Sequence, residues 1–212
     1  MPGIGRLLLF SATAFVVIVI PGPSVIFLVS RALANGSRGA VLSVLGNAFG
    51  EYVQVIGVAF GIGTLVEDSA FVFSALKLIG GAYLIYLGIR TFRQRKSLAA
   101  AIGAVSQPRR RAGSFLEAMT VGATNPKTIV FLAAMLPQFV SRGAGSVPLQ
   151  IMVLGAIFAA IAIISDTVWV LAAGRFRAWF ARSPRRLELV GGTGGLAIAA
   201  VGAGLLVTGR RS

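Results

Sequence analysis

The order of apolar and polar positions divides the chain into long apolar stretches separated by short polar connections. A helix that crosses a bilayer needs about 20 consecutive, mostly apolar residues. The stretches that satisfy this length are 7–29, 40–65, 71–89, 115–137, 148–173 and 188–207. The pattern therefore predicts an all-α integral membrane protein with six transmembrane helices.

The composition favours a single integral domain over residues 1–212. Hydrophobic residues make up 56% of the chain, charged residues 12%, and the mean hydropathy is +0.87. The connections are too short for a second domain, so we expect no soluble catalytic domain and no enzyme. The first apolar run exceeds the ~7–15 residues of a signal peptide. The chain has no cysteine and no histidine, which leaves only carboxylates and carbonyls as metal ligands.

Two of the predicted spans contain a proline motif that interrupts the helix. The motifs are Pro21, Gly22, Pro23 and Ser24 in the first span, and Thr124, Asn125, Pro126 and Lys127 in the fourth. Proline removes a backbone donor and clashes with the preceding turn, so each motif should end one helix and begin another. The breaks should free the carbonyl oxygens of Val17, Val19 and Gly122, and leave amide donors near 24–26 and 127–129. Such donors and acceptors together suit a zwitterionic ligand.

The two halves of the chain resemble each other. LKLIGG, which begins at Leu76, returns as LELVGG at Leu187, and the two proline motifs also occupy corresponding spans. Because each half has three spans, an odd number, the second copy should enter the membrane from the opposite face. We therefore predict a 3+3 inverted repeat with broken helices 1 and 4, made of repeat 1 (about 7–89), a basic loop (about 90–113) and repeat 2 (about 115–207).

Polar side chains inside the predicted spans are few, and charged ones are costly there and usually functional. Asn47, Glu51 and Gln54 share one face of the second span, Thr120, Thr124 and Lys127 repeat that spacing in the fourth, and Asp166 lies in the fifth. We expect these stripes to face each other, so that the carboxylates bind a substrate ammonium or exchange a proton while Lys127 faces a substrate carboxylate. The alternatives for Lys127 are an ion pair with either carboxylate, or snorkelling to the interface.

The net charge of +14 is concentrated where short loops meet the spans. The first, third and fifth loops hold Arg31, Arg38, Arg90, Arg93, Arg95, Lys96, Arg109, Arg110, Arg111, Arg175, Arg177, Arg182, Arg185 and Arg186. The positive-inside rule places these loops in the cytoplasm and both termini outside. The lipid bilayer is thus the expected partner of the basic residues. Nucleic acid is not, because no aromatic interleaving accompanies them.

Three segments together resemble the lysine exporter family, which includes the homoserine/threonine resistance exporters. They are PGPSVIFLVSRALANGSRGAVLSVLGNAFGE, LKLIGGAYLIYLGIRTFR and TNPKTIVFLAAMLPQFV, in that order. The resemblance implies a bacterial inner-membrane exporter of amino acids or their derivatives, driven by an ion gradient, with the proton as the expected coupling ion. It marks Pro21, Gly22, Pro23, Asn125, Pro126 and Lys127 as signature positions, and pairs Asp166 with Trp169 in a D-x-x-W pattern.

Several alternatives stay open at this point. Freed carbonyls with Glu51 and Asp166 would also supply oxygen ligands for a divalent-cation exporter, although one nearby lysine and so few carboxylates disfavour it. No cofactor and no resident metal are expected. Five spans rather than six, and a homo-oligomer, are both compatible with the sequence.

Overall fold

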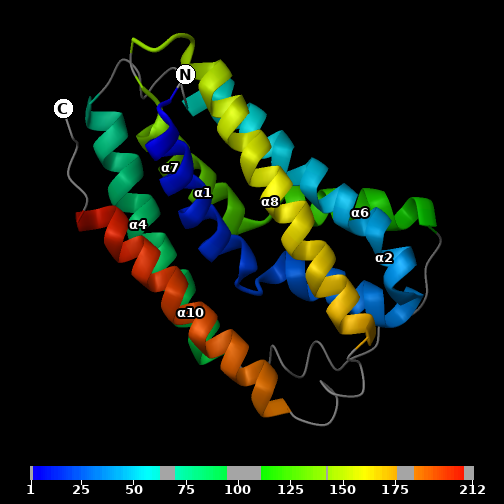
Figure 1. The fold of residues 1–212 in the computed structure, drawn as a ribbon. Helices are drawn as coiled ribbons and strands as arrows, with labels where there is room; N and C mark the ends of the chain where they lie inside the picture. The colour runs from blue at the N-terminus through cyan, green and yellow to red at the C-terminus, as the bar shows by residue number, and fades with distance from the viewer. Residues whose placement is uncertain (1, 63–69, 95–110, 142, 176–183, 208–212) are drawn as a thin grey trace.

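The computed structural model describes residues 2–62, 70–94, 111–141, 143–175 and 184–207. Within these ranges the chain is helical and has no strand, as the sequence predicts (Figure 1). The elements are α1 (Ile4–Val19), α2 (Pro23–Gly57), the short π-helix η1 (Val58–Ile62), α4 (Ala70–Arg93), α6 (Arg111–Ala123), α7 (Pro126–Phe139), α8 (Val147–Arg175) and α10 (Pro184–Val207).

The first predicted break lies between α1 and α2. Gly22 is extended, and Pro23 begins α2 at a position where its missing amide donor costs nothing. α1 and the first part of α2, Pro23–Leu33, are bent by 55° from one another. A second bend follows at Gly36, whose φ of 77° is a conformation that glycine adopts without strain. The predicted first loop, between 29 and 40, is shorter than expected, because Arg31 still belongs to the helix that begins at Pro23 and the helical backbone is interrupted at Gly36.

The second predicted break separates α6 from α7. α6 ends at Ala123, and α7 begins at Pro126 after Asn125, whose side chain accepts a hydrogen bond from the Lys127 amide. This is the N-cap arrangement that asparagine favours, so the local sequence accounts for the new helix start.

Glycines bring two pairs of helices into close contact. A Cβ at Gly50 of α2 would collide with the carbonyl oxygen of Met119 in α6. In α4 and α10, Gly81 faces Gly202 and Gly88 faces Gly195, so these two helices pack antiparallel (Figure 1). α4 and α10 carry the repeated LKLIGG and LELVGG segments, and small residues at such contacts are typical of membrane helices.

The apolar core joins α1, α7 and α8. Phe131 of α7 lies between Phe10 of α1 and Phe158 of α8, with ring centroids 6.4 Å and 5.7 Å away. All three side chains are fully buried or nearly so. This core fixes α7, and with it the helix start at Pro126, against the end of α1.

Among the described residues, two helices are long and apolar enough to cross a membrane, Gly39–Gly61 and Val147–Ala173. The bent pair of α1 and the start of α2 counts as a third if it is one span, and Gly192–Val207 is a shorter apolar helix. The spans predicted at 40–65 and 148–173 are thus present as apolar helices. The count of six spans and the inverted repeat stay predictions.

The basic ends of the helices gather on one side of the molecule. α4 ends with Arg90 and Arg93 in its last turn, and α8 ends at Arg175. In Figure 1 both helices run toward the lower side, while the start of α1 and the connection from α7 to α8 lie at the upper side. The predicted loop residues 95–110 and 176–183 lie outside the described residues.

Candidate functional site

A stripe of buried polar side chains runs along the second part of α2. Ser43 and Asn47 are fully buried, and Glu51 is 5% exposed. Gln54, one turn further, is half-buried. The stripe faces Asp166 of α8 and the start of α7, where Thr128 and Lys127 are also buried. These residues form the polar cluster: Ser43, Asn47, Glu51, Gln54, Lys127, Thr128 and Asp166.

Two hydrogen bonds tie the carboxyl groups of the polar cluster to neighbouring helices. Nδ2 of Asn47 donates to Oδ2 of Asp166 over 3.2 Å, and Oγ1 of Thr128 donates to Oε1 of Glu51 over 3.3 Å. The charges of Glu51 and Asp166 also interact with each other and with the Lys127 ammonium. The sequence placed these charged residues in three different spans, and the fold brings them together.

Several buried oxygen atoms of the polar cluster have no hydrogen-bond partner within the described ranges. They are Ser43 Oγ, Asn47 Oδ1, Glu51 Oε2 and Gln54 Oε1. The amide oxygens of Asn47 and Gln54 can only accept, because each amide nitrogen already faces an acceptor, and Glu51 Oε2 accepts when the carboxyl group is ionised. A buried acceptor without a donor costs ~1–3 kcal/mol, so this arrangement suits a ligand rich in N–H donors.

The proline motifs are expected to free three carbonyl oxygens, and each of the three accepts a hydrogen bond from a side chain. Lys127 Nζ donates to the Val17 oxygen over 3.1 Å, and Trp169 Nε1 donates to the Val19 oxygen over 3.1 Å. Gln54 Nε2 donates to the Gly122 oxygen over 2.6 Å. In the structure these donors come from the chain itself, and binding of a cation or a substrate ammonium by these oxygens stays a prediction.

The two helix starts, at Pro23 and Pro126, contact each other. Nδ2 of Asn125 donates to Oγ of Ser24 over 2.7 Å, and both side chains are buried. Several predicted free amides are occupied: Ile26 and Ile129 donate to the first carbonyls of their own helices, and Lys127 donates to Asn125. Pro23 and Pro126 are exposed at the outer side of the starts, whereas Pro21 and Gly22 are buried.

Lys127 is buried, and its ammonium donates its hydrogen bonds to backbone carbonyl oxygens. The residue is 6% exposed, and its ammonium donates to the oxygens of Val17 and Ile20, over 3.1 Å and 2.9 Å. Snorkelling is therefore wrong. A salt bridge joins Arg31 to Glu117, and within the described residues none joins Lys127 to a carboxylate.

The expected match between two polar stripes is wrong for Thr120 and Thr124. Both are exposed, and their hydroxyls donate to the carbonyl oxygens of Leu116 and Thr120 in their own helix. The helix ends between Thr124 and Lys127, so the helical spacing used in the prediction does not continue across the break. Thr128, which the sequence analysis missed, faces Glu51 instead.

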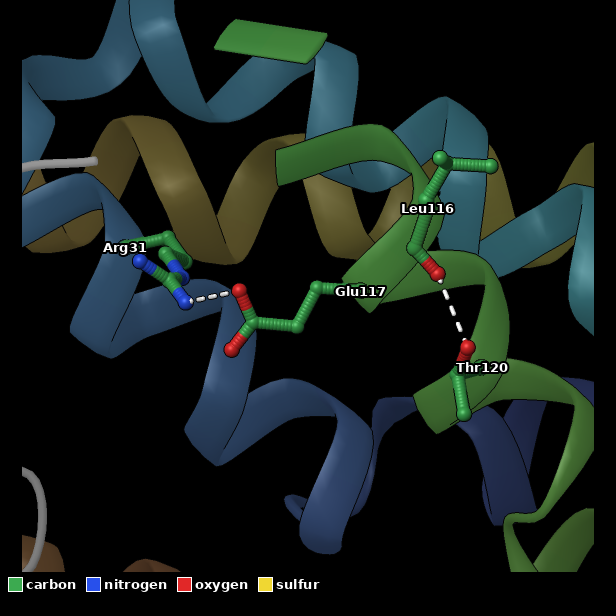
Figure 2. A network of polar contacts seen from close by, with 4 residues as sticks. All are labelled: Arg31, Leu116, Glu117 and Thr120. Atoms are coloured by element: carbon green, nitrogen blue, oxygen red, sulfur yellow. Dashed lines mark hydrogen bonds and ion pairs between the residues drawn. The ribbon is translucent and has the colours of Figure 1, made fainter. Parts of the chain in front are cut away.

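Arg31 is a buried residue rather than a loop residue that marks topology. Its guanidinium pairs with Glu117 of α6 and lies over the Phe27 ring, 5.1 Å from the centroid (Figure 2). Arg31 is 4% exposed, whereas the side chain of Glu117 is 33% exposed. Figure 2 also shows Thr120, on the same helix as Glu117, bonded to Leu116 and not to this pair.

The residues that sequence reasoning missed are Ser43, Thr128 and Arg31, together with the exact role of Trp169. Ser43 precedes Asn47 by one helical turn, so the spacing rule that found Asn47, Glu51 and Gln54 could have included it. No comparable signal in the sequence indicates Thr128. Among the described residues, no group of three or more His, Cys, Asp or Glu side chains could hold a metal ion.

The described residues form apolar helices that are broken at prolines around a buried polar cluster, an arrangement typical of membrane transport proteins. Residues 15–209 match the family model described as LysE type translocator, and the chain belongs to this family. It is 33% identical over 192 residues, 91% of both chains, to the homoserine/homoserine lactone efflux protein of Salmonella typhimurium, and equally to that of Salmonella typhi. It is 36% identical over 148 residues to an uncharacterized membrane protein of Vibrio cholerae, covering 70% of this chain and 71% of that one. No solved structure matches the chain.

Proposed function

We propose that this protein exports a small amino acid or amino-acid derivative across the bacterial inner membrane in exchange for protons. The observation that carries the proposal is the charge of the polar cluster. Glu51 and Asp166 are buried beside a single ammonium, that of Lys127. With all three ionised, the cluster carries one negative charge in excess, and an uncompensated buried charge is costly.

One excess negative charge can be neutralised in two ways. A carboxyl group can take a proton, or the cluster can bind the ammonium of an amino acid. Because either ligand removes the excess, proton and substrate exclude each other, which is the requirement for exchange of one against the other. The unpaired acceptors Asn47 Oδ1, Glu51 Oε2 and Gln54 Oε1 supply partners for the three N–H donors of an ammonium.

The substrates named for two relatives fit this chemistry. Homoserine and homoserine lactone share an α-amino group, but the carboxylate of homoserine is an ester in the lactone. A site that recognises the ammonium accepts both, and it does not need Lys127 as a partner for a carboxylate. Homoserine and its lactone are therefore the first substrates to test with this chain.

Alternating access is proposed as rocking of the half about 7–89 against the half about 115–207, around the breaks at Gly22 and Asn125. The side that carries the basic ends of α4 and α8 is assigned to the cytoplasm, with the start of α1 outside. Outward substrate movement then accompanies inward proton movement.

The test uses proteoliposomes that contain labelled homoserine or homoserine lactone. Acidifying the outside should accelerate efflux, and a protonophore should abolish the acceleration. Glu51→Gln should lower the stimulated rate by roughly tenfold or more, which corresponds to ~1.4 kcal/mol, because it removes the excess charge. The matched control is Glu117→Gln, the same change at a carboxylate outside the polar cluster, which should keep the stimulation per folded molecule. Efflux that ignores the proton gradient, or equal losses in both variants, would contradict the proposal.

A further inference from the structure

The C-terminal end of α1 forms a cradle of carbonyl oxygens inside the protein. α1 ends at Val19, so its last carbonyls lack helical partners, and the partial negative charge of the helix end lies there. Val17 and Ile20 direct their oxygens to one point, where the Lys127 ammonium donates to both of them and to no other group among the described residues. This point is the carbonyl cradle.

Gly22 lies directly against the Lys127 side chain at this point. Gly22 is in an extended conformation that any residue adopts, so backbone strain does not explain the glycine. A Cβ at Gly22 would instead lie 3.3 Å from Nζ and 3.4 Å from Cε of Lys127, which is tighter than ordinary contact. The absence of a side chain at Gly22 therefore lets the ammonium reach the carbonyl cradle.

Free carbonyls at a broken helix end, backed by nearby carboxylates, are the groups with which membrane transporters hold a coupling cation. Here Glu51 and Asp166 both interact with the charge at the carbonyl cradle. The geometry of a cation site is thus complete, and a side chain of the protein occupies it.

We propose that Lys127 is a tethered cation, and that the carbonyl cradle is a monovalent-cation site that becomes open to free cations when this side chain is removed. The Lys127 side chain supplies the positive charge that other transporters with broken helices obtain by binding a cation from solution. The protein consequently needs no inorganic cation at this site, and its proton exchange leaves the Lys127 charge in place.

The test measures thermal unfolding of the purified full-length chain in detergent, at constant chloride, with sodium, methylammonium, n-propylammonium or choline as the cation. Lys127→Ala removes the atoms that n-propylammonium replaces. We expect its unfolding midpoint to rise saturably, by ~5 °C, with n-propylammonium or sodium but not with choline, which has no N–H donor and is too large. Wild type and Lys127→Met, which fills the space without a charge, should show no such rise.

The proposal is overturned if Lys127→Ala responds to every cation no more than Lys127→Met does. If Lys127→Ala alone does not fold, the same titration is made with Lys127→Ala/Glu51→Gln, which restores the charge balance of the polar cluster. Folding of either variant only in n-propylammonium or sodium supports the proposal, and folding of neither in any of these cations overturns it.

A transport measurement adds a second arm, which rests on the proposed function. Efflux by the wild type should be equal in sodium and choline media, whereas Lys127→Ala should recover efflux with n-propylammonium. Cation binding without any efflux would refute the proposed function and leave the tethered cation intact. Proton-coupled efflux by the wild type, without cation binding by Lys127→Ala, would refute the tethered cation and leave the proposed function intact.

Discussion

The side-chain amide of Asn47 donates a 3.2 Å hydrogen bond to Oδ2 of Asp166, and both residues are buried. This bond links α2 to α8 at the level of the polar cluster and turns Oδ1 of Asn47 away from Asp166, without a partner. A single residue therefore both orients one carboxyl group and offers an acceptor. Each task predicts a different result when the residue is changed.

Replacing Asn47 separates these two tasks. Asn47→Leu removes both the donor to Asp166 and the free acceptor. Asn47→Ser keeps a hydroxyl group, which can still donate to Asp166 or accept from a ligand over a longer distance. We expect Asn47→Leu to lower the efflux rate at least tenfold, and Asn47→Ser to retain more of it, because the Asp166 carboxylate loses its donor in the first. Val53→Leu, on an exposed face of the same helix, is the control. Equal efflux by wild type and Asn47→Leu would exclude Asn47 from the site.

The contact between α2 and α6 predicts a contrast between two glycines of one helix. A methyl group at Gly50 would collide with the backbone of Met119 and Ala123, whereas a methyl group at Gly57 meets nothing within 4 Å. Gly50→Ala should therefore destabilise the protein by ~1–3 kcal/mol, and Gly57→Ala should be neutral or gain up to ~1 kcal/mol from helix propensity. Denaturation in detergent measures both. Similar stabilities for the two variants would contradict the close contact.

The pair of Arg31 and Glu117 predicts an asymmetric response. Glu117→Gln leaves the buried Arg31 guanidinium without its counter-charge, and should cost about 1–3 kcal/mol. Arg31→Met leaves Glu117 with the solvent or headgroup access that its partial exposure provides, so its cost should be smaller. The double variant should recover part of the loss. A double-mutant cycle in the same denaturation assay measures the coupling, and costs that simply add would show that the pair contributes nothing.

The cap at the second helix start predicts a stability loss that transport need not share. Asn125→Ala removes the acceptor of the Lys127 amide and the donor to Ser24, and should cost ~1–2 kcal/mol. Asn125→Asp keeps the cap but loses the donor to Ser24, so it separates the two bonds. Ser24→Ala is the matched partner variant. If Asn125→Asp were as stable as wild type, the contact between the two helix starts would carry no stabilisation.

Sequence reasoning went furthest where a local rule acts along the chain. Proline geometry and the capping preference of asparagine predicted both breaks, and the same reasoning named Val17, Val19 and Gly122 as carbonyls in need of donors. It was wrong at Thr120 and Thr124, because helical spacing has no meaning across a break. It placed Arg31 in a loop, whereas the helix that begins at Pro23 includes Arg31 and the backbone departs from helical geometry only at Gly36.

The sequence by itself determined that this protein is a helical membrane protein, that two helices are broken, and which backbone atoms the breaks release, because each of these depends on residues within one or two turns. The tertiary structure decided which donors reach those atoms. Lys127, Trp169 and Gln54 come from helices far away in the chain. The approach of Lys127 and Trp169 depends on how α7 and α8 pack against the end of α1, and that of Gln54 on how α2 packs against α6. Packing is a sum over contacts between distant segments, and spacing along the chain does not contain it.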